Sequence, residues 1–123
     1  MKYHTTITGW GDTALDFLED PKANFIIIFN DDVPPELAEV SVLHTKEKLL
    51  TVPAPGDIVV ISEKVFTITA VGKEAEVTLR NLGHCTLSFK GGSKPERPGC
   101  IMLEGEKPLL KSDIQVENTI EIY

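Results

Sequence analysis

The sequence predicts a mainly β protein, built as a single closed or partly open, mostly antiparallel β-barrel with two or three short helices. About seven to nine segments have the length and composition of strands, and turn residues separate most of them. Residues 25–29 are apolar without alternation, as in a barrel wall buried on both sides. The strand count alone also fits a sandwich. The 123 residues, 41% of them hydrophobic, can bury one core, so we expect a single domain over residues 1–123.

The N-terminal part alternates between strands and short helices. Residues 3–8 form a β-branched strand, one face of which consists of Tyr3, Thr5 and Ile7. Asp12 is a suitable N-cap for a short helix over residues 12–18, whose apolar stripe consists of Ala14, Leu15, Phe17 and Leu18. Prolines and acidic residues in the segment 34–39 predict one or two further helical turns.

A short strand candidate, residues 40–44, follows this helical turn and ends at His44. Residues 53–57 contain two prolines and a glycine, which is the strongest turn signal in the chain. A hairpin is expected next, with strands at residues 58–61 and 65–71 joined by a short loop.

The rest of the chain combines one helix with three strands. Residues 74–82 have apolar side chains at helical spacing, and Gly83 stands where a C-terminal cap belongs. Residues 84–89 then form a strand, and the polar segment 90–99 is a surface loop. The final strands are expected at residues 100–103 and 119–123.

The charge balance bears on partners and location. The chain has 19 acidic and 12 basic residues and a net charge of −7, which disfavours nucleic acid and favours a partner with a basic face. No apolar run is long enough to span a bilayer, and residues 1–6 lack the features of a signal peptide. We therefore expect a cytoplasmic protein without membrane insertion. Cys85 and Cys100 have no metal-ligand spacing and are interpreted as small core thiols.

His44 is the candidate reactive residue. A neutral imidazole at a strand end can accept a phosphoryl group on one nitrogen while a neighbour holds the other. Thr45 could supply a hydroxyl group, and Lys46 or Lys48 a positive charge, to the phosphoryl oxygens. The alternative is a structural histidine on a strand edge guarded by lysine. His84, at the predicted corner between helix and strand, could orient His44, stabilise its phosphoryl group or only close the barrel end.

A motif in the second half of the chain is its most specific feature. It consists of Thr69-Ala70-Val71-Gly72, then Asn81-Leu82-Gly83-His84-Cys85-Thr86-Leu87-Ser88-Phe89, then Pro98-Gly99. Together with the opening strand and the segment around His44, this motif resembles the glucitol/sorbitol-specific IIA component of the bacterial sugar phosphotransferase system. The resemblance extends over nearly the whole chain.

The resemblance implies a β-barrel phosphotransferase that needs no cofactor. It implies that the histidine phosphocarrier protein donates a phosphoryl group to His44, and that the group then passes to a cysteine of the IIB component. The sugar itself would be taken up by the membrane IIB/IIC permease. His84 would be a supporting residue.

Two structural expectations accompany this function. Because a relay histidine must meet two proteins in turn, we expect His44 to be at least partly exposed in a shallow depression. We also expect a small docking interface with an apolar centre and an acidic rim. The residues of the centre would be Val40, Val42 and Leu43, and those of the rim Asp31, Asp32, Glu36 and Glu39.

Two other function classes remain open from the residues alone. A small acidic barrel could be a noncatalytic regulatory or ligand-binding module, in which His44 is one contact among many. A cysteine enzyme could use Cys85 or Cys100 with a histidine, although an apolar strand face disfavours a thiolate at Cys85. His4, on the polar face of the first strand, is interpreted as structural. The three histidines show no metal-ligand spacing.

Overall fold

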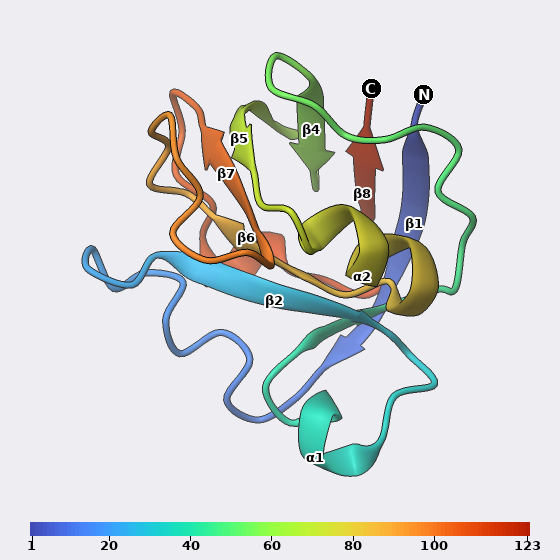
Figure 1. The fold of residues 1–123 in the computed structure, drawn as a ribbon. Coiled ribbons are helices and arrows are strands. Elements are labelled where there is room, and N and C mark those ends of the chain that lie inside the picture. The colour runs from blue at the N-terminus through green and yellow to red at the C-terminus, as the bar shows by residue number, and fades with distance from the viewer.

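The strands close into a barrel in the computed structural model, which describes all residues from Met1 to Tyr123 (Figure 1). Around the barrel the strand order is β1-β3-β2-β6-β7-β5-β4-β8. The strands are β1 (Tyr3–Trp10), β2 (Phe25–Asn30), β3 (Val42–His44), β4 (Ile58–Ile61), β5 (Lys64–Val71), β6 (Cys85–Ser88), β7 (Cys100–Glu104) and β8 (Thr119–Ile122). The helices are α1 (Pro35–Ala38), α2 (Ala75–Leu82) and the 3-10 helix η1 (Lys111–Asp113). The predicted fold class is confirmed.

Most strand pairs are antiparallel, and the two exceptions are β2 with β3 and β6 with β7. The parallel pair β2–β3 determines the environment of His44. Its register sets Ile28 beside Val42, Phe29 beside Leu43 and Asn30 beside His44. Paired residues of parallel strands point to the same side of the sheet, so Asn30 and His44 share the barrel interior.

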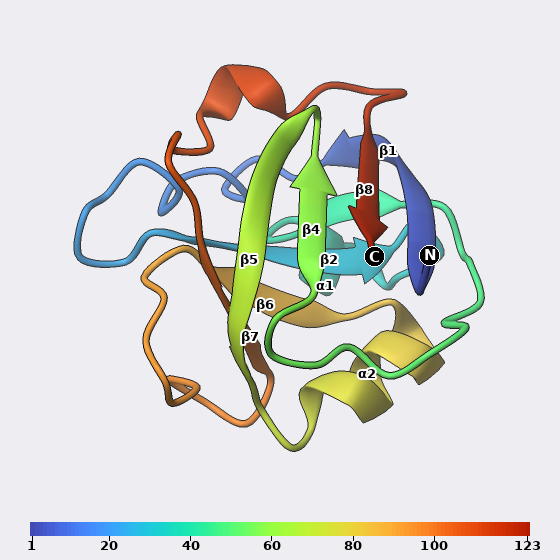
Figure 2. The ribbon, with the colours of Figure 1, turned by 90° about the horizontal axis from the view of Figure 1, so that it is seen from above.

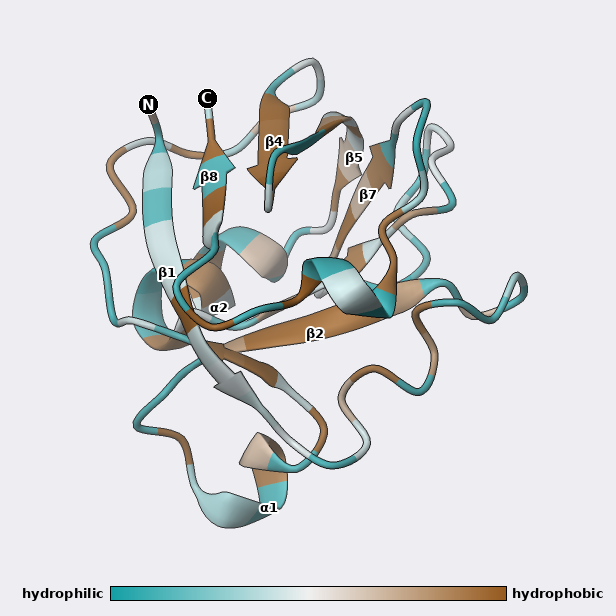
Figure 3. Cartoon of the chain, turned by 180° about the vertical axis from the view of Figure 1, so that it is seen from behind, coloured by the Kyte–Doolittle hydropathy of each residue, from teal (hydrophilic) through white to brown (hydrophobic).

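The interior is filled by alternate strand residues, which pack into one apolar cluster. Each such isoleucine or leucine contributes about 1.5–3 kcal/mol relative to an exposed position. The hydropathy colouring shows β4 hydrophobic along its length, whereas β1 is mostly pale or hydrophilic (Figure 3). Members of the cluster from six strands are Ile7, Ile28, Ile61, Ile68, Leu87 and Ile101.

The helix predicted over residues 12–18 is wrong. This segment is a succession of turns held by hydrogen bonds between residues three apart, from Ala14 N to Gly11 O and from Leu18 N to Leu15 O. The start of the segment is bound to a distant part of the chain, because Thr13 N donates to Glu39 O. Ala14 and Leu18 still enter the core, so the apolar pattern was satisfied without an α-helix.

The hairpin and the second helix follow the sequence signals closely. A two-residue turn joins β4 to β5, and its residues Ser62 and Glu63 have φ of 49° and 76°, as a type I′ turn requires. The predicted loop was one residue longer, since Lys64 already belongs to β5. Helix α2 ends at Leu82, and Gly83 forms the C-terminal cap with φ of 61°.

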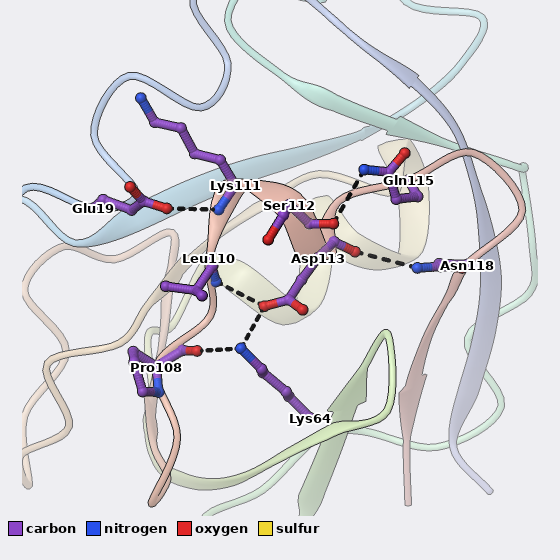
Figure 4. Close-up of polar contacts among 9 residues, drawn as sticks. All are labelled: Glu19, Lys64, Pro108, Leu110, Lys111, Ser112, Asp113, Gln115 and Asn118. Carbon is purple, nitrogen blue, oxygen red and sulfur yellow. Dashed lines mark hydrogen bonds and ion pairs between the residues drawn. The ribbon is translucent and has the colours of Figure 1, made fainter.

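Polar contacts close one side of the barrel around η1 (Figure 4). Lys64 Nζ lies 2.6 Å from Asp113 Oδ2 and donates to Pro108 O at 2.7 Å. The same Asp113 oxygen accepts the amide of Leu110 at 2.8 Å. We call Lys64, Pro108, Leu110 and Asp113 the η1 clamp.

No helix in the structure has both the length and the apolar character needed to span a membrane.

Candidate functional site

His44 is fully buried, with 0% of its surface exposed, so the prediction of a partly exposed histidine is wrong. Two features explain the burial. Strand β3 pairs with β1 on one side and β2 on the other, so it is a central strand rather than an edge. Alternation along this strand turns Val42 and His44 inward and leaves Leu43 on the outer side.

Hydroxyl and carbonyl oxygens surround Nδ1 of His44. Thr5 Oγ1 and the carbonyl oxygen of Thr45 each lie 2.9 Å from this nitrogen. Thr5 Oγ1 also donates to Thr45 O at 2.7 Å and lies 3.0 Å from Thr45 Oγ1. The hydroxyl of Thr45 in turn accepts the amide of Thr6 at 3.1 Å. The barrel wall therefore holds this side of the ring through both main chain and side chains.

A single carbonyl group covers the other ring nitrogen. His44 Nε2 lies 2.7 Å from Gly83 O, at the corner between α2 and β6. A carbonyl oxygen only accepts hydrogen bonds, so Nε2 must carry a proton to make this contact. A Cβ atom on Gly83 would lie 2.7 Å from His44 Cε1 and would also clash with Asn30 Oδ1. Glycine therefore permits both the left-handed cap and the close approach to the ring.

The acceptors around His44 compete for its protons. With Nε2 protonated, a neutral ring leaves Nδ1 as an acceptor, so Nδ1 and Thr45 O compete for the single proton of the Thr5 hydroxyl. A doubly protonated ring would satisfy both carbonyl groups. In either state Nε2 is a donor, so this closed arrangement has no free lone pair for a nucleophilic attack at Nε2.

Two further residues flank the ring. Tyr3 meets it edge-on, with ring centroids 6.2 Å apart and planes at 89°. Asn30 ends β2 beside His44, is 5% exposed, and leaves Oδ1 without a hydrogen-bond partner. Both residues are part of the barrel interior.

His84 directly follows Gly83 in the chain, but it makes no hydrogen bond to His44. Its Nδ1 lies 3.3 Å from Ile28 O, and its ring packs against Phe29 with centroids 4.5 Å apart. Burial lowers the pKa of His84, and the hydrogen bond to Ile28 O opposes that shift. The residue that reaches His44 is therefore its neighbour Gly83.

The charged residues after His44 lie in solvent. Lys46 Nζ is 3.7 Å from Asp32 Oδ2, with the two side chains 70% and 63% exposed. Such an exposed pair contributes little to stability. Lys48 is exposed as well, and neither lysine forms a hydrogen bond or an ion pair with a residue of the His44 site. Both lysines are solvated, as the alternative for them required, but they follow β3 instead of guarding an edge strand.

The remaining candidates are apart from the ring. Cys85 and Cys100 are buried free thiols, and burial raises the pKa of each. Raised thiol pKa values leave little thiolate at neutral pH, which disfavours a cysteine enzyme. His4 is exposed and stands beside Glu121 in the register of β1 and β8.

Sequence reasoning did not include Thr5, Asn30 and the Gly83 carbonyl in the site. Thr5 could have been found, because alternation puts it on the same inward face as Tyr3, and a buried hydroxyl needs a partner. Asn30 lies beside His44 because β2 pairs with β3, and the Gly83 carbonyl reaches it by a hydrogen bond from a distant part of the chain. The local sequence has no signal for either contact.

The chain matches the family model described as "PTS system glucitol/sorbitol-specific IIA component" over residues 2–121. Two curated proteins named "PTS system glucitol/sorbitol-specific EIIA component", from Escherichia coli strain K12 and Shigella flexneri, are each 37% identical over 106 residues. Each alignment covers 86% of this chain and 84% of the relative.

A solved structure has the same fold. It is described as "The Crystal Structure of PTS System IIA Component from Enterococcus faecalis V583". It superposes with a TM-score of 0.77 at 26% identity, covering 97% of this chain and 98% of the other. The closed barrel thus recurs over essentially the full length of both chains.

Proposed function

This chain belongs to the family of glucitol/sorbitol-specific IIA components of the sugar phosphotransferase system, and on that premise we propose that His44 is its phosphoryl acceptor. The phosphoryl group comes from the histidine phosphocarrier protein and passes to a cysteine of the IIB component during sugar uptake. The whole chain, residues 1–123, acts as one phosphocarrier domain in the cytoplasm. The family match over residues 2–121 is the observation that carries this function.

The geometry supports His44 rather than the other histidines. It is the one histidine with hydrogen-bonding partners at both ring nitrogens, which fixes the plane of the ring. In-line phosphoryl transfer depends mainly on such positioning. His4 is exposed on the outer face of β1, and His84 packs against Phe29 outside the barrel interior.

Reaction at Nε2 requires the corner at Gly83 to open. The wall residues Thr5 and Thr45 hold Nδ1, whereas the carbonyl group of this corner is the one hydrogen-bond partner of Nε2. When Gly83 O withdraws, Nε2 releases its proton to solvent and Nδ1 carries one, which a doubly protonated ring keeps and a neutral ring takes up from solvent, and Nδ1 donates it to Thr45 O. This tautomer leaves the lone pair of Nε2 free.

The transfer step then balances in atoms and charge. Nε2 of His44 attacks the phosphorus atom of the phosphohistidine on the phosphocarrier protein. A nitrogen–phosphorus bond forms on His44 while the one on the carrier breaks, and the carrier nitrogen leaves with the electron pair and takes up a proton from solvent. In the next step a cysteine thiolate of the IIB component attacks the same phosphorus atom and releases His44. Thr45 O holds the Nδ1 proton throughout.

His84 supports the site by fixing the corner at Gly83, and it does not contact the His44 ring by a hydrogen bond. Its amide donates to Thr78 O at 3.1 Å and its Nδ1 lies near Ile28 O, so it fixes the corner against β2. This role makes His84 a positioning residue, which influences how the corner opens and closes for the second protein.

The docking surface that we propose differs in its apolar centre from the one expected from the sequence. Val42 is fully buried, so it is no part of an apolar centre. Trp10, Leu37 and Val40 are exposed by 41%, 45% and 40%, and Gly11 N donates to Ser41 O, which joins the end of β1 to the segment after α1. We propose these three as the apolar centre. We retain Asp31, Asp32, Glu36 and Glu39, which are all exposed, as the proposed acidic rim.

The burial of His44 favours the alternative function, a noncatalytic regulatory module. In that case the ring would only bridge β1 and the corner at Gly83. Incubation with phosphoenolpyruvate and the general phosphotransferase proteins separates the two functions. We expect a mass increase of one phosphoryl group that is acid-labile and base-stable and that maps to His44. A protein that stays unmodified while the phosphocarrier protein is fully phosphorylated would support the regulatory module.

A further inference from the structure

Asn30 carries an unexplained polar atom next to the acceptor histidine. Three buried side-chain atoms in the structure lack a hydrogen-bond partner: Tyr3 Oη, Asn30 Oδ1 and Ser62 Oγ. Two of these three belong to residues that flank His44. A buried polar group without a partner is unfavourable and rare, so a pair of them around one ring calls for an explanation.

The other buried polar side chains in and next to the strands are satisfied. Ser41 Oγ donates to Leu37 O at 2.7 Å, and Ser88 Oγ donates to Glu96 Oε1 at the same distance. Thr5 reaches both His44 and Thr45. The hydroxyl groups of Thr5, Ser41 and Ser88 are thus paired within the fold, whereas Asn30 Oδ1 is not.

The position of Asn30 is defined by backbone pairing. It is the last residue of β2 and stands opposite His44 in the parallel register, so its side chain enters the interior beside the ring. Both Asn30 Oδ1 and His44 Cε1 lie against the Cα of Gly83, where no Cβ could fit. Cε1 is bonded to both ring nitrogens, so a group beside it also flanks a phosphoryl group on either nitrogen.

We propose that Asn30 is a further catalytic residue, whose side-chain amide donates a hydrogen bond to the phosphoryl group on His44. The proposal rests on His44 being the acceptor. In the closed structure Oδ1 has no partner and lies, like Cε1 of the ring, next to the position that a Cβ on Gly83 would occupy. When the corner at Gly83 opens, a half-turn about χ2 exchanges Oδ1 for the Nδ2 amino group. Nδ2 then donates to an oxygen of the phosphoryl group, whose negative charge strengthens this hydrogen bond.

The test compares stability with the rate of phosphoryl transfer in Asn30→Leu. Leucine has a similar volume and removes the unpartnered oxygen, so the melting temperature should stay the same or rise. The rate of labelling by the phosphorylated phosphocarrier protein should nevertheless fall about 10-fold or more, as expected for losing one hydrogen bond to a charged group. Asn30→Asp, which replaces the donor with a negative charge, should be slower still.

Ser62→Ala is the matched control, because it removes an unpartnered hydroxyl at the turn between β4 and β5, apart from the site. It should leave the labelling rate unchanged. Equal labelling rates for wild type, Asn30→Leu and Asn30→Asp would overturn the role of Asn30 while His44 remains the acceptor. Wild-type protein that takes no label on His44 would instead overturn the proposed function, and the role of Asn30 with it. If Asn30→Leu unfolds, the slower labelling of a folded Asn30→Asp decides the question.

Discussion

The η1 clamp and the His44 site are both polar clusters in the barrel, but they differ in how fully their polar groups are paired. In the clamp, the ammonium group of Lys64 and the carboxylate of Asp113 each have more than one close partner. In the His44 site, carbonyl groups compete for the protons of one ring and Asn30 Oδ1 has no partner. Figure 2 shows α2, which ends at the His44 site, and the orange-red η1 on opposite sides of the barrel.

The difference fits a structural role for the clamp and the proposed reactive role for the His44 site. Every group of the clamp is paired in one fixed arrangement, so any movement there loses interactions. The His44 site has more than one hydrogen-bonding arrangement of similar energy. A change of tautomer or a movement of Gly83 exchanges one set of hydrogen-bond partners of the ring for another. A phosphoryl carrier needs this second property, since its histidine must be held in two chemical states.

The largest expected effect is at the ring itself. His44→Ala should abolish phosphorylation, because no other histidine is held for in-line transfer. His84→Ala should leave slow labelling of His44 and impair onward transfer to the IIB cysteine, because it loosens the corner without removing the acceptor. Rapid mixing with the phosphorylated phosphocarrier protein, followed by the IIB component, measures both steps.

Each histidine variant has an outcome that contradicts the assignment. Retained labelling of His44→Ala would refute His44 as the acceptor. An equal loss of the first step in both variants would show that His84 belongs to the acceptor machinery. The clamp variant Lys64→Met is the control for general loss of structure, and it should transfer at the wild-type rate at a temperature where it is folded.

The next effect concerns the corner. Gly83→Ala should destabilise the protein by about 1–3 kcal/mol, because it combines left-handed backbone strain with a clash against His44 and Asn30. Labelling should also slow, since the ring is displaced. Gly92→Ala is the matched control: Gly92 has φ of 91°, but a Cβ there would meet nothing within 4 Å. Chemical denaturation of both variants isolates the clash, and equal losses would mean that Gly83 serves only as a cap.

Much of the fold could be predicted from the sequence because its signals are local. Strand alternation, the turn before β4 and the glycine after α2 each act within a few residues, and all are confirmed. The helix over residues 12–18 failed because the apolar spacing could be satisfied by turns once Thr13 was bound to Glu39. A distant partner thus overrode a local preference.

The site was predictable only in part. His44 could be singled out from its neighbours, but its burial depends on strands on both sides and on the corner at Gly83. The parallel register of β2 and β3 puts Asn30 beside the ring, and parallel pairing leaves no turn signal in the sequence. Lys46 and Lys48 were attractive from sequence proximity alone, although strand and loop geometry leaves both in solvent.

The clamp offers a smaller, pH-dependent effect. Burial by itself raises the pKa of Asp113, but hydrogen bonds from Lys64 and the Leu110 amide, with the charge of Lys64, hold it below the ordinary value of 3.8. A lowered folded-state pKa adds stability that is present above pH 3.8 and is lost as the pH falls through the folded value. Asp113→Asn should therefore cost about 1–2 kcal/mol at pH 7 and progressively less below about pH 4.

Thermal melts of wild type and Asp113→Asn across this pH range measure the effect. The labelling rate of Asp113→Asn at pH 7 should equal that of wild type wherever both are folded, since the clamp takes no part in transfer. A difference in stability that does not vary with pH would show that the carboxylate charge is unimportant, and a slowed transfer would connect the two clusters.

The smallest effect is on encounter with the phosphocarrier protein. The exposed acids Glu36 and Glu39 should steer a partner with a basic face toward Trp10, Leu37 and Val40. Raising the ionic strength to about 0.5 M screens exposed charges beyond a few ångströms, so the second-order labelling rate should fall several-fold. The lifetime of the phosphohistidine should hardly change, because the buried site is screened much less.

Charge reversal locates this surface. Glu36→Lys with Glu39→Lys should reproduce the effect of high salt, whereas Glu104→Lys with Glu106→Lys, which changes the net charge equally beside the η1 clamp, should have a smaller effect. The comparison removes total charge as an explanation, since both double variants gain the same charge and differ only in its position. If the two slow labelling equally, steering follows net charge alone. If neither does, the docking surface lies on another part of the barrel, and the exposed apolar residues near α1 would then need a different partner to explain them.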